Sequence, residues 1–158
     1  MPTLELHTTI AAPAERVFDL TRSVDAHAAT ATSTDERPVG GVTTGLMELG
    51  DEVTWSARHL GLRWRLTSRI TGFERPTYFR DSMVRGVFRR FDHDHWFESR
   101  GDTTHVREVF DFTSPLGILG DLANALAVTR HMRDFLETRA QGLKELAESD
   151  GWRSFIAE

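Results

Sequence analysis

The first residues of the chain alternate between hydrophobic and polar side chains. Leu4, Leu6, Thr8 and Ile10 share one side of this alternation, and polar or charged residues stand between them. A repeat of two residues is typical of a β-strand with one buried face. The pattern therefore predicts a strand over residues 3–10.

Helical signals and a loop follow this strand. Ala12-Pro13 begins a short helix, because proline is tolerated at the first helical position, and hydrophobic residues up to Leu20 give that helix an apolar side. Residues 22–30 favour a second helical turn. Residues 30–44 are rich in Thr, Ser, Gly and Pro, which predicts a loop.

The middle of the chain returns to strand-like alternation. In the clearest run, from Trp64 to Ile70, hydrophobic or small residues alternate with arginine and threonine. Turn signals separate the strands and no interval leaves room for a crossover helix, so we expect an antiparallel meander. The other strands expected here cover residues 46–49, 53–58, 77–84, 87–99 and 103–113.

After residue 114 the hydrophobic residues recur every three or four positions. Ser114-Pro115 supplies a cap and a helix start, and the hydrophobic stripe extends from Leu119 to Ala147. This pattern predicts one long amphipathic helix, bent near Gly117–Gly120. Its stripe must pack on the apolar face of the sheet, because such a helix is not stable alone.

These elements together predict an α+β fold. We expect a curved antiparallel sheet of about seven strands around the long C-terminal helix, with two short helices after the first strand. Residues 1–148 form a single domain, and residues 149–158 form a tail. Trp152 and Phe155 make the tail partly apolar, so it packs either on the domain or on a second copy of the chain as a homodimer.

Composition narrows the functional classes. The 158 residues include no cysteine, which excludes disulfides, thiolate metal sites and cysteine catalysis. The net charge of −5 argues against nucleic acid as a general partner. No basic leader precedes an apolar run, and no segment suits stable membrane insertion, so we expect a cytoplasmic protein.

The charge is unevenly distributed along the chain. Residues 58–90 contain nine arginines and two acidic residues, a net charge of +7, whereas residues 1–57 and 91–158 each carry −6. Alternation assigns Arg63, Arg65 and Arg69 to the outer face of the sheet. This basic surface suits an acidic partner or an anionic lipid, although a solvated face is the simpler interpretation.

One motif and the order of elements resemble a known superfamily. The segment Ile10-x-Ala12-Pro13-x-Glu15-x-Val17-Phe18-Asp19-Leu20, followed by a meander and a closing helix, resembles the START-like helix-grip superfamily (SRPBCC). That group includes birch-pollen-allergen-like binders, lipid-transfer domains and polyketide cyclases. The stretch from Gly50-Asp51-Glu52-Val53-Thr54-Trp55 to His93-Asp94-His95 resembles a bacterial cyclase/dehydrase-like subgroup of unsettled function. The resemblance implies a deep apolar cavity between the sheet and the long helix.

Counting cross-strand partners outward from each predicted turn identifies polar residues that face this cavity. If Gly101-Asp102 forms a two-residue turn, His95 lies opposite Glu108, and alternation puts both on the inward face. By the same arithmetic, Arg75-Pro76 brings Ile70 opposite Asp81.

Two further hairpins complete the inward face. A turn at Leu60-Gly61 places Trp55 opposite Leu66, and a three-residue loop or a glycine bulge at Arg85-Gly86 leaves Phe79 near His93. His59 extends the inward face. The predicted polar set is Asp81, His93, His95 and Glu108. The predicted walls are Trp55, Trp64, Phe91, Phe97 and Phe110.

This polar set has several interpretations. A buried histidine beside a glutamate is most simply a satisfied structural pair, and ligand binding and catalysis are the alternatives. Two histidines at i and i+2, with Glu108 or His59, would also offer metal ligands. The resemblance implies no metal, and we predict no metal and no other cofactor. His7, His105 and His131 are expected outside, in solvent.

Three functions follow from these observations. The leading hypothesis is a non-catalytic protein that binds a small hydrophobic molecule, aromatic, polyketide-like or lipid-like, with the polar set and walls as binding residues. The second is a cyclase/dehydratase-type enzyme in which His95 or His93 is the general base, oriented by Asp81 or Glu108. The third is a protein-interaction module. A ligand-sized cavity favours the first two, and a collapsed one opposes them.

Overall fold

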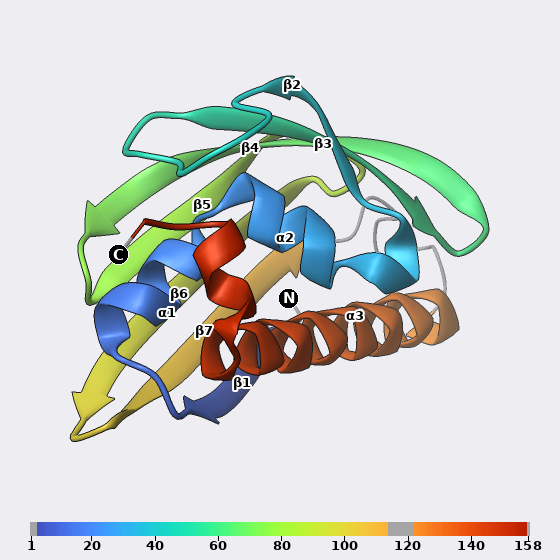
Figure 1. Ribbon diagram of the computed structural model, residues 1–158. Coiled ribbons are helices and arrows are strands. Elements are labelled where there is room, and N and C mark those ends of the chain that lie inside the picture. Colours follow the sequence, from blue (N-terminus) through green and yellow to red (C-terminus); the bar gives the residue numbers. More distant parts are fainter. Residues whose placement is uncertain (1–2, 114–121, 158) are drawn as a thin grey trace.

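The computed structural model describes residues 3–113 and 122–157, and the side chains of α3 from residue 126 onward. The strands form a single antiparallel sheet in the order β1-β7-β6-β5-β4-β3-β2, which curves around the helices (Figure 1). The strands are β1 Thr3–Ile10, β2 Arg37–Gly41, β3 Glu52–His59, β4 Leu62–Glu74, β5 Tyr78–Arg85, β6 Arg90–Arg100 and β7 Thr103–Thr113.

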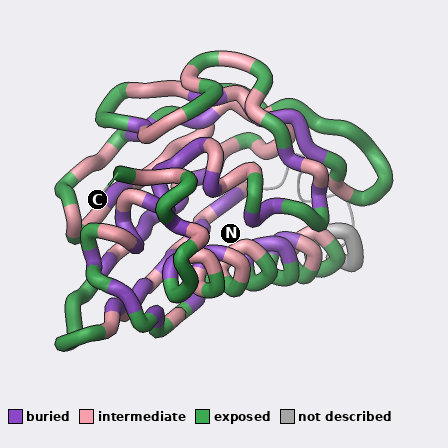
Figure 2. Tube along the Cα trace, viewed as in Figure 1, coloured by how far each residue is buried: buried purple, intermediate pink, exposed green. Residues whose placement is uncertain are grey.

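Three helices lie against the concave side of this sheet. The long helix α3 contacts β1, α1 and α2, and its buried residues form a stripe toward the sheet (Figure 2). The helices are α1 Ala14–Thr21, α2 Val24–Thr30 and α3 Leu122–Glu148, with short 3-10 helices η1 Thr32–Thr34 and η2 Asp150–Ser154. The predicted fold class is confirmed. The predicted helix start at Ser114-Pro115, Leu119 and the bend near Gly117–Gly120 lie outside the described residues.

Two predictions for residues 30–49 are wrong. The expected loop contains β2, and the expected strand over residues 46–49 is reduced to one bridge between Leu46 and Ser23. Pro38 and two glycines are atypical of a strand, so the sequence pattern did not predict β2. An edge strand such as β2 tolerates these residues, whereas an inner strand does not. Gly41 is required there: it has φ +70°, and a Cβ would lie 2.2 Å from the carbonyl oxygen of Glu52.

Short loops set the register of three hairpins as predicted. His95 lies opposite Glu108, Trp55 opposite Leu66, and Ile70 opposite Asp81. In the last pair the loop is one residue longer than expected, and a bulge between Ile70 and Gly72 compensates for it.

The β5–β6 register differs from the prediction. Phe79 lies opposite His95, and Asp81 lies opposite His93, because the loop between Arg85 and Arg90 is longer than expected. The shift is two residues, so each side chain keeps its face of the sheet.

The C-terminal tail packs on its own chain. Trp152 of η2 is buried in the core that also contains Val17, Phe18 and Leu143. The Arg16 guanidinium lies 4.2 Å from the centre of the Trp152 ring, a cation–π geometry. Residues beyond α3 therefore contribute to the core of the described domain.

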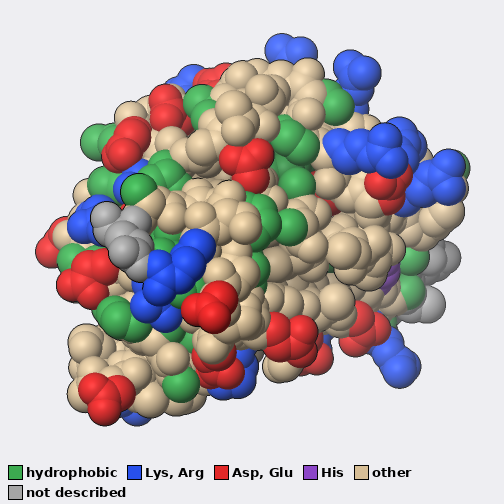
Figure 3. All heavy atoms as spheres, in the orientation of Figure 1, with side chains coloured by type: hydrophobic (Ala, Val, Ile, Leu, Met, Phe, Trp, Pro, Cys, Tyr) green, Lys and Arg blue, Asp and Glu red, His purple; other side chains and the backbone are tan. Residues whose placement is uncertain are grey.

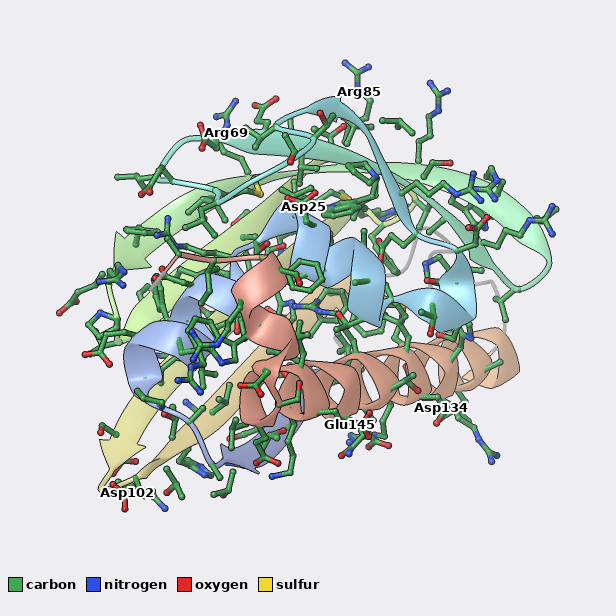
Figure 4. The ribbon with its side chains drawn as sticks, in the orientation of Figure 1. Asp25, Arg69, Arg85, Asp102, Asp134 and Glu145 are labelled. Atoms are coloured by element: carbon green, nitrogen blue, oxygen red, sulfur yellow. The ribbon has the colours of Figure 1, made fainter. Side chains whose placement is uncertain are left out.

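Arginine and acidic residues share the outer surface. Arg69 and Arg85 point away from the sheet, and Asp134 and Glu145 point away from α3 (Figure 4). Basic side chains gather at one end of the sheet (Figure 3). The predicted basic face is partly neutralised, because Arg63 pairs with Asp35 at 2.7 Å and Arg69 pairs with Glu52.

Candidate functional site

A narrow pocket lies between the sheet and α3. It has a volume of about 50 Å³, and its lining includes Trp55, Phe79, Asp81, His95 and Arg139. Ligand sites usually measure ~300–1,000 Å³. The deep cavity implied by the resemblance is thus not open among the described residues.

The four predicted polar residues meet beside this pocket, which Asp81 and His95 line. Asp81 of β5, His93 and His95 of β6, and Glu108 of β7 face inward from three adjacent strands. The two imidazole rings are tilted against each other with centroids 3.9 Å apart. His95 is 1% exposed and His93 3%. The structure therefore assembles the predicted set, and its role in binding or catalysis stays a prediction.

Each histidine stands between the two carboxylates. His95 Nε2 lies 3.3 Å from Asp81 Oδ1, and His95 Nδ1 lies 3.1 Å from Glu108 Oε1. His93 Nδ1 lies 3.8 Å from Asp81 Oδ1, and His93 Nε2 lies 3.7 Å from Glu108 Oε1. Of these contacts only His95–Asp81 has hydrogen-bond geometry, so His93 Nε2 and His95 Nδ1 are buried without a hydrogen-bond partner.

The charges of the cluster shift its pKa values in opposite directions. Burial and the charge of His95 lower the pKa of His93 to about 3. Burial also acts to lower the pKa of His95, but Asp81 and Glu108 outweigh it and raise that pKa. Burial acts to raise the pKa of both carboxyls, yet the histidines lower the pKa of Asp81, and that of Glu108 to about 2. The two carboxylates therefore stabilise the protonated form of His95.

Most of the predicted aromatic walls are buried. Trp55 lines the pocket, whereas the rings of Phe91, Phe97 and Phe110 belong to the packed core around the cluster. The predicted burial of Trp64 is wrong: it is 41% exposed. Trp64 lies near the end of the β3–β4 hairpin, where its indole N–H donates to the His59 carbonyl.

Sequence reasoning missed Arg139, which lines the pocket from α3. Arg139 follows Leu136 by three residues and precedes Leu143 by four, so a charge within the hydrophobic stripe was the available signal. Its positive charge helps to lower the pKa of Asp81. Arg139 makes no hydrogen bond or ion pair with any residue that the structure describes.

A second missed group is His27 of α2. Its ring stacks on Trp55 with centroids 4.2 Å apart, and its Nε2 lies 2.9 Å from Glu36 Oε2. Burial and the charge of Arg139 lower the pKa of His27. His27 follows Val24 by three residues, which places it on the inward side of α2; Glu36 lies in the segment predicted as a loop and carried no signal.

The remaining histidines lie away from the pocket. His59 faces inward as predicted and meets the Phe135 ring edge-on at 5.4 Å. His131 was expected in solvent, but it is half-buried with Nε2 2.9 Å from His59 Nδ1, because α3 crosses this end of the sheet. His7 and His105 stack on the outer face, 5.2 Å apart; His7 is exposed as predicted, but His105 is half-buried and its Nδ1 is sealed from solvent.

Comparisons with known proteins agree with this architecture. The family model described as polyketide cyclase / dehydrase and lipid transport matches residues 1–148. Among curated proteins none matches the chain. No helix in the described part of the chain is both long and apolar enough to span a membrane.

Several solved structures share the fold at low sequence identity. TTHA0849 from Thermus thermophilus has a TM-score of 0.75 and 22% identity, covering 91% of this chain and 95% of that one. The ZhuI aromatase/cyclase from Streptomyces sp. R1128 has a TM-score of 0.74 and 15% identity, covering 93% of each chain. A START superfamily protein from Mycobacterium smegmatis has a TM-score of 0.70 and 13% identity, covering 92% and 97%. At these identities the likeness extends to the fold alone.

Proposed function

Because the chain belongs to the family of polyketide cyclases/dehydrases and lipid-transport proteins, we propose that it binds a small hydrophobic molecule in the pocket beside α3. The ligand is aromatic, polyketide-like or lipid-like, and it carries an oxygen-bearing polar group. Trp55 and Phe79 line the apolar part of the pocket, and Asp81, His95 and Arg139 line the polar part. A few convergent polar groups in an aromatic surround are the usual composition of a ligand site.

The observation that carries this proposal is the state of Arg139. A guanidinium removed from water is costly unless it is paired; Arg139 is half-buried and lines the pocket without a hydrogen bond or ion pair to a described residue. A carbonyl or carboxylate oxygen of the ligand supplies the missing acceptor.

The pocket volume of about 50 Å³ among the described residues does not hold a ring system, and this observation opposes the proposal. Binding therefore requires the pocket to widen. Met47 and Arg139 line it, and both are long side chains with several rotatable bonds. Their movement gives space without altering the strand register.

Two calorimetric titrations test this function in the presence of EDTA. The probes are 2-naphthoate and 2-naphthylmethanol, which share a ring system and differ in charge, and the readout is the heat of binding. We expect saturable binding of both, tighter for naphthoate. Arg139→Leu should remove that preference, and Arg133→Leu, an exposed arginine of the same helix, should retain it.

Two results would contradict the proposal. The first is absence of saturable binding of either probe, together with native mass spectrometry that finds no co-purified hydrophobic molecule. The second is an unchanged naphthoate preference in Arg139→Leu, which would remove the role of Arg139.

A dehydratase-type activity is the second candidate, and the position of His95 favours it. His95 lines the pocket beside Asp81, and its raised pKa suits a proton donor instead of the general base expected from the sequence. In loss of water from a β-hydroxyketone, Asp81 accepts the carbon-bound proton, the carbon–oxygen bond breaks, and His95 protonates the departing hydroxide.

The ultraviolet absorbance of the enone product measures the dehydration of a ring-bearing β-hydroxyketone. His95→Gln should abolish turnover but retain naphthoate binding. Turnover equal to that of the wild type would exclude His95 as the proton donor.

A further inference from the structure

The arrangement of the four polar residues suits a metal ion as well as an ion pair. Asp81 Oδ1, His93 Nδ1 and His95 Nε2 converge on one side of the two rings, and one ligand atom from each of these residues lies within 4.8 Å of the others. We infer that Asp81, His93 and His95 form a binding site for one divalent transition-metal ion, with Glu108 orienting both histidines. This inference does not rest on the proposed function.

The distances on the Asp81 side match a coordination polyhedron. An ion with bonds of 2.0–2.2 Å in tetrahedral geometry separates its ligand atoms by roughly 3.3–3.6 Å. The observed separations from Asp81 Oδ1 are 3.3 Å to His95 Nε2 and 3.8 Å to His93 Nδ1. The second distance is too long for a hydrogen bond, but a small rotation of the His93 ring brings it to the edge length of such a site.

Glu108 lies where an outer carboxylate belongs. A histidine that binds a metal through one ring nitrogen usually donates its other N–H to a carboxylate or carbonyl. The ring nitrogens that face away from Asp81 are His93 Nε2 and His95 Nδ1, and both face Glu108 Oε1, at 3.7 Å and 3.1 Å. Both are buried without a hydrogen-bond partner, as is His105 Nδ1 on the other face of the sheet. When both ring N–H groups donate to it in the metal-bound state, this one carboxylate would fix the tautomer of both ligands.

The types of ligand atom narrow the choice of ion. Two carboxylates and two neutral imidazoles carry −2, which attracts a cation, and the nearby charge of Arg139 reduces this attraction. Nitrogen and oxygen ligands together favour Zn²⁺ or Fe²⁺ over Ca²⁺ or Mg²⁺, which prefer oxygen alone.

The proposed site has an open side toward the pocket. Asp81 and His95 line the pocket, and the Asp81 side chain is 22% exposed while the histidines are sealed. Three protein ligands with one free position are typical of a metal site that also binds a small molecule. A ligand oxygen in the pocket would therefore reach the fourth position.

Calorimetric titration of EDTA-treated, dialysed protein with Zn²⁺ tests the inference, and Co²⁺ reports ligand geometry through its visible absorption. We expect one ion per chain and the intense bands of tetrahedral cobalt. Asp81→Asn and His93→Gln should weaken binding by at least tenfold, and Glu108→Gln by about 10–100-fold, as for outer partners of metal-bound histidines. The matched control is His7→Gln with His105→Gln, the stacked pair on the outer face of the sheet, which should bind as the wild type does.

Several results would overturn the inference. They are no stoichiometric binding of either ion by the wild type, binding retained in both ligand variants, or binding lost only in the His7/His105 control. Circular dichroism checks folding of each variant. If His93→Gln does not fold, metal binding by Asp81→Asn, whose site of substitution is partly exposed, and the cobalt spectrum of the wild type decide whether the site exists.

Discussion

Replacing Glu108 by glutamine should destabilise the fold by about 3 kcal/mol. The pKa of Glu108 falls from its ordinary 4.5 to about 2, and at about 1.4 kcal/mol per pH unit this difference is worth about 3 kcal/mol. The Glu108 side chain is only 10% exposed, so solvent screens this interaction little. Loss of one partner of a buried pair typically costs a similar ~3–5 kcal/mol.

The pH dependence of this loss identifies its origin. The pKa of Glu108 is lower in the folded state, so its contribution is complete above pH 4.5 and is lost as the pH falls toward 2. The pKa of His95 is raised, so its contribution is complete below pH 6.5 and is lost as the pH rises through the folded value. The difference between wild type and Glu108→Gln should therefore be largest between pH 4.5 and pH 6.5.

Urea unfolding followed by circular dichroism measures this difference at about pH 3, 5.5 and 9, with EDTA present. Glu98→Gln is the matched control, because Glu98 is on the same strand as His95 but exposed, and it should have no measurable effect. Equal stability of Glu108→Gln and wild type near pH 5.5, or a loss that is the same at every pH, would refute the electrostatic reasoning.

Three packing predictions can be checked by the same unfolding assay. Phe79→Ala should cost ~3–5 kcal/mol, because the ring is buried and stacks on His95 at 4.3 Å; a loss below ~1 kcal/mol would mean that the site collapses freely. Trp152→Ala should cost a similar ~3–5 kcal/mol, since this ring joins the tail to the core, and wild-type stability would show that the tail is dispensable. Gly41→Ala should destabilise by more than ~1 kcal/mol, because φ is +70° and a Cβ meets the Glu52 carbonyl; Gly45→Ala, where a Cβ meets nothing within 4 Å, separates the steric part of this loss from the conformational part.

The sequence by itself determined the element types and the inward polar face. Periods of two and of three to four residues distinguish strands from the long helix, because each element exposes only one side to solvent. Register followed wherever a loop was short: the two-residue turn at Gly101-Asp102 alone places His95 opposite Glu108. The longer β5–β6 loop broke this rule, and the face of Asp81 was still correct because the error was two residues.

Only the tertiary structure decided what surrounds that polar face. Arg139 and His27 reach the pocket from two helices, and no local pattern states where on the sheet a helix will pack. The pocket volume depends on how side chains from distant segments interdigitate. The spacing of hydrophobic residues along the sequence does not contain this information. Trp64 shows the same limit: it shares the inward parity of β4, but it is 41% exposed. Alternation thus fixes the direction of a side chain, and only the packing of helices on the sheet fixes what it meets.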